Sequence, residues 1–161
     1  MTEPSELERR TQETCLRHGR RPDALLEILH EIQASEGFVP RDCVPAIADA
    51  LNLSRAEVHG VVTYYHDFRS APAGRCVVKL CRAEACQAVG ADAVAADVEA
   101  RLGVASGETS ADGAVTVETV YCLGDCALGP SAMIDGQLYG RVTPDRVADL
   151  VRKATANGDA S

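Results

Sequence analysis

Four of the seven cysteines stand in two short pairs, Cys81 with Cys86 and Cys122 with Cys126. Four residues separate the members of the first pair and three separate those of the second, in the stretch CLGDCALGP. Cysteine thiolates bind soft metal centres, and sets of four hold either a structural zinc ion or a [2Fe–2S] cluster. The two pairs therefore predict one four-thiolate site.

The spacing within the pairs favours a two-iron cluster over zinc. Zinc needs four sulfurs about 2.3 Å from one centre and usually takes them from tight knuckles. Looser turns suit two metal centres better than one. The pairs are not C-x2-C, which disfavours a thioredoxin-type dithiol, and they do not match the plant-ferredoxin run C-x4-C-x2-C. Structural zinc and a set of buried thiols remain the alternatives.

A [2Fe–2S] cluster with four thiolates is negatively charged and becomes more so on reduction, so its sulfurs need backbone N–H donors. Gly90, Gly124 and Gly129 lie in or beside the two turns, where glycine permits positive φ and lets N–H groups point inward. Arg82, beside Cys81, adds a cation, whereas Asp125 between the second pair opposes reduction.

The C-terminal half is predicted to fold as β-α-β-β-β-α, which is the order of a thioredoxin-like domain. The strands are expected at 75–81, 114–122, 131–134 and 137–142, and the helices at 91–104 and 143–157. Asp135-Gly136 predicts a two-residue hairpin. Thr143 is the expected N-cap of the last helix, and Gly158 is expected just past its end.

The order of these elements explains how the two pairs would meet. A right-handed crossover makes strands 75–81 and 114–122 parallel neighbours. Their C-terminal ends then lie at one sheet edge, and both cysteine turns project from it. Helices are expected to cover the faces of the sheet.

The N-terminal half is predicted to be a helical bundle. Apolar residues recur at helical spacing in 23–37, 44–52 and 54–68, and more weakly in 7–17. Ser54 and Glu57 form a capping-box pattern, and the apolar stripe that follows consists of Val58, Val61, Val62 and Tyr65. The segment RSAPAGR at 69–75 divides an α+β chain into a bundle, 1–72, whose first residues are expected to be disordered, and a thioredoxin-like domain, 73–161.

Charge and composition limit the partners. The net charge is −8, and Lys plus Arg number 8 against 12 Asp plus Glu in 1–72 and again in 73–161. Such a chain should not bind nucleic acid or anionic membrane non-specifically. The sequence shows no membrane-spanning stretch and no signal peptide, so we expect a cytoplasmic protein whose cysteines stay reduced.

Several long stretches resemble one family, the thioredoxin-like [2Fe–2S] subunit of NADH:quinone oxidoreductase (complex I) and its relatives. These relatives include subunits of NAD-linked hydrogenases and the gamma subunit of NAD-dependent formate dehydrogenase. Besides both cysteine pairs, the resemblance includes LLEILHEIQASEGFVP, AEVHGVVTYYHDF, ADGAVTVETVYCLGDCALGP and LYGRVTPDRV.

The resemblance implies a role in electron transfer. It implies that Cys81, Cys86, Cys122 and Cys126 hold a [2Fe–2S] cluster that exchanges single electrons with FMN on a partner subunit, which also binds NAD. Further iron–sulfur or molybdenum subunits are implied as well. This chain would have no substrate site of its own, since it contains neither G-x-G-x-x-G nor a P-loop.

Two departures from the complex I pattern bear on the parent complex. Arg82–Ala85 replaces a Gly-Thr-Ala type of stretch, and Thr63-Tyr64-Tyr65 replaces Thr-Phe-Tyr. CRAEACQ resembles the formate dehydrogenase branch, which makes formate dehydrogenase the favoured parent. The equivalent subunit of NADH:quinone oxidoreductase or of an NAD-linked hydrogenase is the alternative.

A metal-sensing helix-turn-helix regulator with a four-cysteine zinc site is an alternative of another class, suggested by residues 47–65. Its recognition helix would carry Arg55 as its one lysine or arginine, too little charge for phosphate contacts.

The other cysteines, the histidines and the aromatic residues of the N-terminal half are assigned no role in the site. Cys76 is predicted to be core, Cys15 and Cys43 to be spectators, and His18, His30, His59 and His66 to lie at the surface or its boundary. Tyr64, Tyr65 and Phe68 are interpreted as packing residues, with docking to a partner subunit as the alternative.

Overall fold

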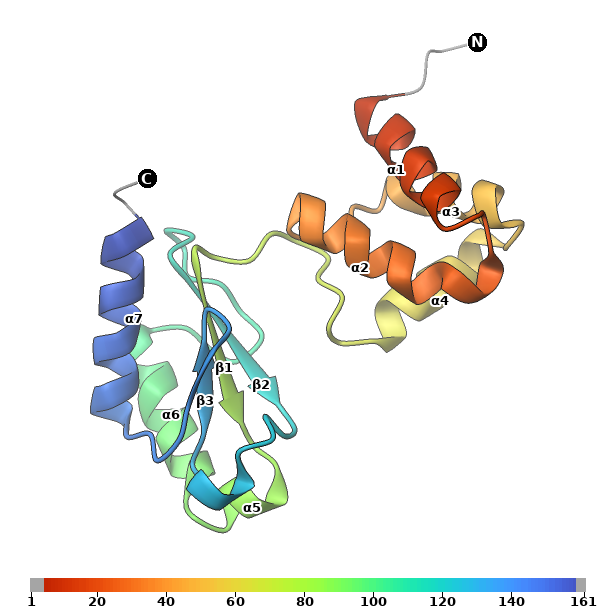
Figure 1. The fold of residues 1–161 in the computed structure, drawn as a ribbon. Coiled ribbons are helices and arrows are strands. Elements are labelled where there is room, and N and C mark those ends of the chain that lie inside the picture. The colour runs from red at the N-terminus through yellow and green to blue at the C-terminus, as the bar shows by residue number, and fades with distance from the viewer. Residues whose placement is uncertain (1–4, 159–161) are drawn as a thin grey trace. The chain divides into compact units, whose positions relative to one another are not determined.

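The structure, a computed structural model, describes residues 5–158 (Figure 1). Residues 1–4, for which the sequence predicts disorder, lie outside the described residues. The chain divides into two compact units, residues 1–72 and residues 73–161. The first unit is helical, and the second contains a four-stranded sheet with helices.

The N-terminal unit consists of the four helices that the sequence predicts. They are α1 (Glu6–Arg17), α2 (Leu25–Glu36), α3 (Cys43–Leu51) and α4 (Arg55–Tyr64). Pro22–Ala24 form a 3-10 turn, η1, before α2, so this helix begins two residues later than predicted. Their buried faces share one core that includes Ile28, Leu29, Ile47 and Val58.

Helix α4 begins as predicted and ends earlier. The Ser54 hydroxyl accepts from Glu57 N–H at 3.1 Å, and the Glu57 carboxylate accepts from Ser54 N–H at 2.8 Å, which is the predicted capping box. The helix ends at Tyr64, and Tyr65 is extended and 43% exposed, so its place in the apolar stripe was wrong. Phe68 instead turns back into the core, 8% exposed, because the chain leaves the helix before it.

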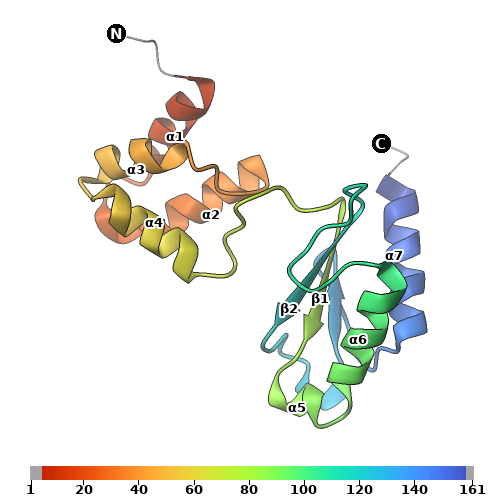
Figure 2. The same cartoon turned by 180° about the vertical axis from the view of Figure 1, so that it is seen from behind.

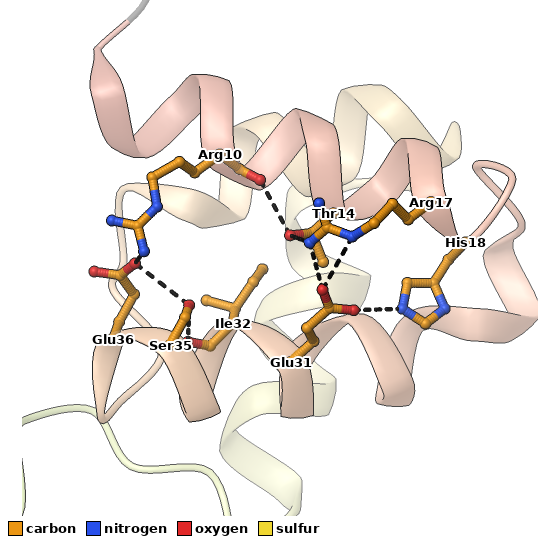
Figure 3. A network of polar contacts seen from close by, with 8 residues as sticks. All are labelled: Arg10, Thr14, Arg17, His18, Glu31, Ile32, Ser35 and Glu36. Atoms are coloured by element: carbon orange, nitrogen blue, oxygen red, sulfur yellow. Dashed lines mark hydrogen bonds and ion pairs between the residues drawn. The ribbon is translucent and has the colours of Figure 1, made fainter.

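Polar pairs join α1 to α2 at the surface (Figure 3). Arg10 forms an ion pair with Glu36, at 2.6 Å between guanidinium nitrogen and carboxylate oxygen. The Glu31 carboxylate contacts both Arg17 and His18, with His18 Nε2 2.8 Å from Glu31 Oε2. The guanidinium of Arg17, followed by His18, lowers the pKa of Glu31. The buried residues of α2 are aliphatic, whereas those of α1 are Thr11, Thr14 and Cys15.

The C-terminal unit has the predicted β-α-β-β-β-α order, with one extra short helix. The central strand β1 (Cys76–Cys81) pairs in parallel with β2 (Val115–Val120), with Cys76 opposite Val115 and Cys81 opposite Val120. On its other side β1 pairs antiparallel with β3 (Ala132–Ile134), which pairs with β4 (Gln137–Tyr139). The strand order is therefore β2-β1-β3-β4.

The two long helices of this unit pack on the same face of the sheet. Side chains of α6 (Ala91–Leu102) and α7 (Pro144–Gly158) share a core with Cys76, Val78 and Leu80 of β1. Figures 1 and 2 show α6 and α7 side by side. The expectation that helices cover both faces was wrong, because the apolar sides of α6 and α7 both join this one core. The opposite face carries the Lys79–Glu118 pair, at 3.6 Å.

Local signals set the hairpin and the last helix. Asp135 and Gly136 both have positive φ, 47° and 78°, as a tight two-residue turn requires. Thr143 Oγ1 accepts from Arg146 N–H at 3.3 Å, which confirms its role as N-cap. Helix α7 continues through Gly158 instead of ending before it. Among residues 5–158, no helix is long and apolar enough to cross a membrane.

Candidate metal centre

The four cysteines of the two pairs lie at the ends and turns that follow β1 and β2. Cys81 is the last residue of β1, and Cys86 lies in the short helix α5 (Glu84–Gln87). Cys122 follows the end of β2, and Cys126 begins the 3-10 turn η2 (Cys126–Leu128). Because β1 and β2 are parallel, both turns leave the same edge, where α5 packs against η2 (Figures 1 and 2).

The strand before the second pair ends sooner than predicted. Strand β2 stops at Val120, so Tyr121 and Cys122 already belong to the turn. Cys122 has φ of 107° and Gly124 has φ of 84°. Positive φ at a residue with a side chain costs energy and marks a locally constrained backbone. The turn therefore bends at Cys122, and its sulfur is placed by that bend.

The sulfur atoms lie as two pairs. Cys122 Sγ and Cys126 Sγ are 3.7 Å apart, and the Cys86 thiol acts to lower the pKa of Cys81. Cys122 raises the pKa of Cys126, and the charges of Cys86 and Cys81 from the other turn add to that increase. All four thiols thus share one electrostatic neighbourhood. Within the described residues, no group of three or more His, Cys, Asp or Glu side chains is arranged to hold a single metal ion.

Backbone N–H groups converge on Cys81. Burial opposes its ionisation, but the N–H of Ala83, the Cys86 thiol and the N–H groups of Leu123 and Cys122 outweigh burial and lower the pKa of Cys81. Two of these donors come from the second turn, so the turns cooperate in stabilising this thiolate. Gly124 N–H similarly donates to Cys122 Sγ at 3.4 Å. Such donors suit a group whose sulfurs carry negative charge.

Burial differs between the two pairs. Cys81 and Cys86 are 3% and 1% exposed, whereas Cys122 and Cys126 are exposed. Burial and then the neighbouring Cys81 raise the pKa of Cys86, while the N–H and hydroxyl of Ser131 act in the opposite direction. One side of the site is therefore dry and the other faces solvent.

Two of the three glycines predicted to supply positive φ do so. Gly90 has φ of 91° and precedes α6, and Gly124 lies in the second turn. Gly129 was wrongly predicted, since its φ is −59°. Glycine fits at position 129 because little space is left there: a Cβ would lie 3.0 Å from Val89 Cγ2 and 3.3 Å from Cys86 Sγ. A side chain at this position would therefore crowd both residues.

Arg82 and Asp125, the two charged residues singled out beside the cysteines, both lie against residues outside the two cysteine turns. Arg82 Nε donates to Asp92 Oδ1 at 2.9 Å, so its charge is already paired. The Asp125 carboxylate lies over Gly140, where a Cβ would be 2.6 Å from Asp125 Oδ2. Leu128 Cβ is equally close to that position, so Gly140 permits the chain after β4 to pack directly on the second cysteine turn.

The other three cysteines lie in the cores. Cys76 is fully buried in the core beneath the sheet, as predicted, and burial followed by Asp135 raises its pKa to about 12. Cys15 and Cys43 are buried in the helical unit, where Thr11 Oγ1 donates to Cys43 Sγ at 3.2 Å. Burial raises the pKa of both. None of the seven cysteines forms a disulfide.

The aromatic and histidine predictions have mixed outcomes. Phe68 packs in the core beside His30, with ring centroids 4.9 Å apart, but Tyr64 is 75% exposed and is not a packing residue. His18 is bound at the surface by Glu31. A groove of about 150 Å³ between α1 and α2 is bounded by the ion pairs of Figure 3 and contains none of the predicted site residues.

Sequence reasoning missed Ser131 and Gly140, which both touch the cysteine turns. Ser131 is 3% exposed and stands between the first turn and the second. Gly140 lies inside the predicted strand 137–142, where an interior glycine suggests a bulge or close approach of another backbone; the observed β4 ends at Tyr139, just before it. For Ser131, a single serine before a strand carries no such signal.

Comparisons with known proteins show extensive similarity. Residues 11–155 match the family model described as thioredoxin-like [2Fe–2S] ferredoxin, and this match includes residues 47–65, on which the regulator alternative was based. A subunit of the NADH-quinone oxidoreductase of Pseudomonas aeruginosa is 36% identical over 148 residues, which cover 91% of this chain and 89% of that protein. The subunit HndA of the NADP-reducing hydrogenase of Solidesulfovibrio fructosivorans is 33% identical, covering 79% and 74%.

The fold is also similar to that of a solved structure. The superposition on an NAD+-reducing [NiFe]-hydrogenase in the air-oxidized state has a TM-score of 0.70 at 22% identity. It covers 86% of this chain, which spans about a quarter (24%) of that hydrogenase chain. At this identity the likeness shows a shared fold.

Proposed function

Because the chain belongs to the thioredoxin-like [2Fe–2S] ferredoxin family, whose cofactor is a [2Fe–2S] cluster, we propose that it is an electron-transfer subunit. The complex in question is an NAD-linked oxidoreductase that contains flavin and iron–sulfur centres. Relatives named as NADH-quinone oxidoreductase and NADP-reducing hydrogenase subunits support this proposal.

The proposed ligands are Cys81, Cys86, Cys122 and Cys126. The observation that carries this assignment is the packing of α5 against η2, which brings two cysteine turns from distant parts of the sequence to one sheet edge. The N–H groups that point at Cys81 and Cys122 fit negatively charged sulfurs. A single zinc ion is supported less well, because the C-x4-C and C-x3-C spacings are looser than the tight knuckles from which zinc usually takes its ligands.

The chain's own residues would protect and orient the cluster. When bound, a [2Fe–2S] cluster supplies a centre that accepts and donates one electron at a time. Buried Cys81 and Cys86 exclude water from one side of the site, while exposed Cys122 and Cys126 bring the other side to the molecular surface. Exposure on that side is what exchange of electrons with a partner subunit requires.

The proposed partner is a subunit that binds FMN and NAD, with further iron–sulfur or molybdenum subunits in the same complex. A partner must supply the nucleotide site, because the sequence has neither a G-x-G-x-x-G motif nor a P-loop. We place the complex in the cytoplasm, where free thiols persist. Nucleic acid and direct membrane insertion form no part of this proposal.

For the parent enzyme, we favour NAD-dependent formate dehydrogenase, in the role of its gamma subunit. The support is the CRAEACQ stretch at 81–87, which contains most of the first cysteine turn. NADH-quinone oxidoreductase is the second candidate, favoured by relatives of 34–36% identity over most of the chain. An NAD-linked hydrogenase is supported by the similarity to the hydrogenase subunit HndA.

The cluster assignment is tested by anaerobic purification of the full chain, followed by absorption spectra and EPR after dithionite. A red-brown protein with one spin-half signal is expected. Cys86→Ser should remove or damage the cluster, whereas Cys76→Ser, a matched change at a buried core cysteine, should leave the spectrum intact. A colourless protein with stoichiometric zinc, or an unchanged spectrum in Cys86→Ser, would contradict the proposal.

The parent complex is tested separately, by purifying the tagged chain from its native host with the proteins bound to it. Formate-dependent NAD+ reduction by the isolated complex is the expected result. NADH-dependent quinone reduction without formate activity would instead identify the second candidate. Hydrogen-dependent reduction of the nicotinamide would identify the third.

A further inference from the structure

Ser131 occupies the point where the two cysteine turns meet. It directly precedes β3 and is 3% exposed. Its carbonyl oxygen accepts from Cys81 N–H at 3.0 Å, which fixes Ser131 to the end of β1. A polar residue this deeply buried at a predicted cofactor site must have its hydrogen-bonding groups satisfied by its neighbours.

The Ser131 hydroxyl faces acceptors of the second turn. It lies 3.3 Å from the carbonyl oxygen of Asp125 and 3.5 Å from that of Leu128. The hydroxyl is therefore bound to the second turn, while the carbonyl of the same residue is bound to the end of β1 at Cys81.

We infer that Ser131 is a positioning residue for the cluster, fastening the second cysteine turn at Asp125 and Leu128 to the end of β1 at Cys81. The inference rests on the proposed function, since it concerns the ligands of the proposed site. Its consequence is that Ser131 controls how firmly the cluster is retained and also its reduction potential. Hydrogen bonds to ligand sulfurs are known to change both properties in metal sites.

Ser131→Ala removes the hydroxyl and little else. Leu128 O keeps the N–H of Arg141 at 2.5 Å, and Asp125 O keeps the N–H of Leu128 at 3.0 Å. The carbonyl of residue 131 still accepts from Cys81 N–H. The variant is therefore expected to fold, while the link between the end of β1 and the second turn is weakened.

The experiment compares release of iron from reconstituted full chains to a coloured chelator. We expect Ser131→Ala to lose iron about two- to tenfold faster than the wild type, the effect of one hydrogen bond of ordinary net strength. Ser110→Ala is the matched control. Ser110 Oγ also serves two backbone groups, accepting from Ala114 and Val115 N–H at 3.0 Å each, at the opposite end of β2. It should release iron at the wild-type rate.

The reduction potential separates positioning from a general loss of stability. The second turn supplies the Gly124 N–H that donates to Cys122 Sγ at 3.4 Å. Reduction adds negative charge, so loosening the turn that holds this donor should lower the potential of Ser131→Ala. A tenfold change in the one-electron equilibrium corresponds to about 59 mV, which sets the upper end of the expected shift. Ser110→Ala should keep the wild-type potential even where its thermal stability falls.

Equal iron release and equal potential in Ser131→Ala and wild type would overturn the inference, as would equal effects in the Ser110→Ala control. If Ser131→Ala does not fold, Ser131→Thr decides, because it retains a hydroxyl. Release of iron from Ser131→Thr at the wild-type rate supports the inference, and release at least about tenfold faster than from the wild type refutes it. Absence of a cluster from the wild-type chain is a different result, which refutes the proposed function itself.

Discussion

Gly140→Ala is the substitution that tests most directly how the second cysteine turn is held. A Cβ at residue 140 would lie 2.6 Å from Leu128 Cβ, 2.6 Å from Asp125 Oδ2 and 3.0 Å from Leu128 O. The Asp125 carboxylate ends a flexible side chain and can move aside. Leu128 cannot do so as easily, because its carbonyl accepts from Arg141 N–H at 2.5 Å and its N–H donates to Asp125 O at 3.0 Å.

The size of the effect follows from these contacts. Ordinary van der Waals contact begins at 3.4 Å, so Leu128 Cβ must retreat by 3.4 − 2.6, or about 0.8 Å. Overpacking of this kind costs about 1–3 kcal/mol, and each kcal/mol lowers the Tm of a unit of this size by roughly 4–8 °C. Because η2 runs from Cys126 to Leu128, the displacement reaches Cys126.

The assay combines thermal unfolding with the visible spectrum of the reconstituted chain. Gly74→Ala is the matched control, since a Cβ there would lie 2.9 Å from the Val115 backbone nitrogen and carbon, at the start of β2. Both variants should lose stability. We expect Gly140→Ala alone to bleach or shift the cluster absorption, because it alone displaces a cysteine turn.

Two results would refute this reasoning. A Gly140→Ala protein with wild-type Tm would show that Leu128 yields at no cost. A Gly140→Ala protein that is destabilised as much as Gly74→Ala, yet has an unchanged spectrum and an unchanged rate of iron release, would show that the packing of Gly140 on η2 does not position Cys126.

Three further predictions concern other parts of the chain. Arg17 and then His18 lower the pKa of Glu31 from its usual 4.5, so the stability that the Glu31 carboxylate contributes is present above pH 4.5 and is lost as pH falls through the folded pKa. The urea midpoints of wild type and Glu31→Gln should therefore converge on acidification. A constant difference between the two midpoints would contradict this prediction. Burial and then Asp135 raise the pKa of Cys76 from 9.0 to about 12, so the wild type should lose stability as pH rises between these values, because the thiol ionises first in the unfolded chain. Cys76→Ala should lack this alkaline loss of stability. Parallel pH profiles of the two proteins would contradict the raised pKa of Cys76. Gly60→Ala, in the exposed interior of α4 with nothing within 4 Å of the added Cβ, should raise the free energy of unfolding by about 0.5–1 kcal/mol in denaturant titrations, and a decrease would show an unrecognised contact.

Features that depend on neighbours in the sequence were predictable. The Ser54–Glu57 capping box and the Asp135–Gly136 turn were both identified from residue types alone, because their hydrogen bonds and φ angles involve residues no more than three apart. The parallel pairing of β1 with β2 was also predicted, since a right-handed crossover leaves few other arrangements.

Features that depend on distant neighbours were predicted less well. Tyr65 fits the apolar period of its helix, yet it is exposed because α4 ends one residue before it. Gly129 was interpreted through its φ angle, but the constraint there is the space taken by Val89 and Cys86 from another turn. Periodicity likewise could not tell that α6 and α7 share one face of the sheet.

By itself, the sequence determined the chemistry available to this protein. Its two pairs of thiols predicted one four-thiolate metal site, and its equally distributed negative charge argued against non-specific binding to nucleic acid or anionic membrane. These properties belong to residue types and local spacing, which folding does not alter.

Only the tertiary structure decided how the two turns are joined. It showed that Ser131 links them, that Gly140 lets the chain after β4 pack on the second, and that one cysteine pair is buried while the other is exposed. Each of these facts arises from atoms brought together by the sheet, so no pattern of nearby residues contains it. The physical reason is that close packing and burial are properties of the whole assembled fold.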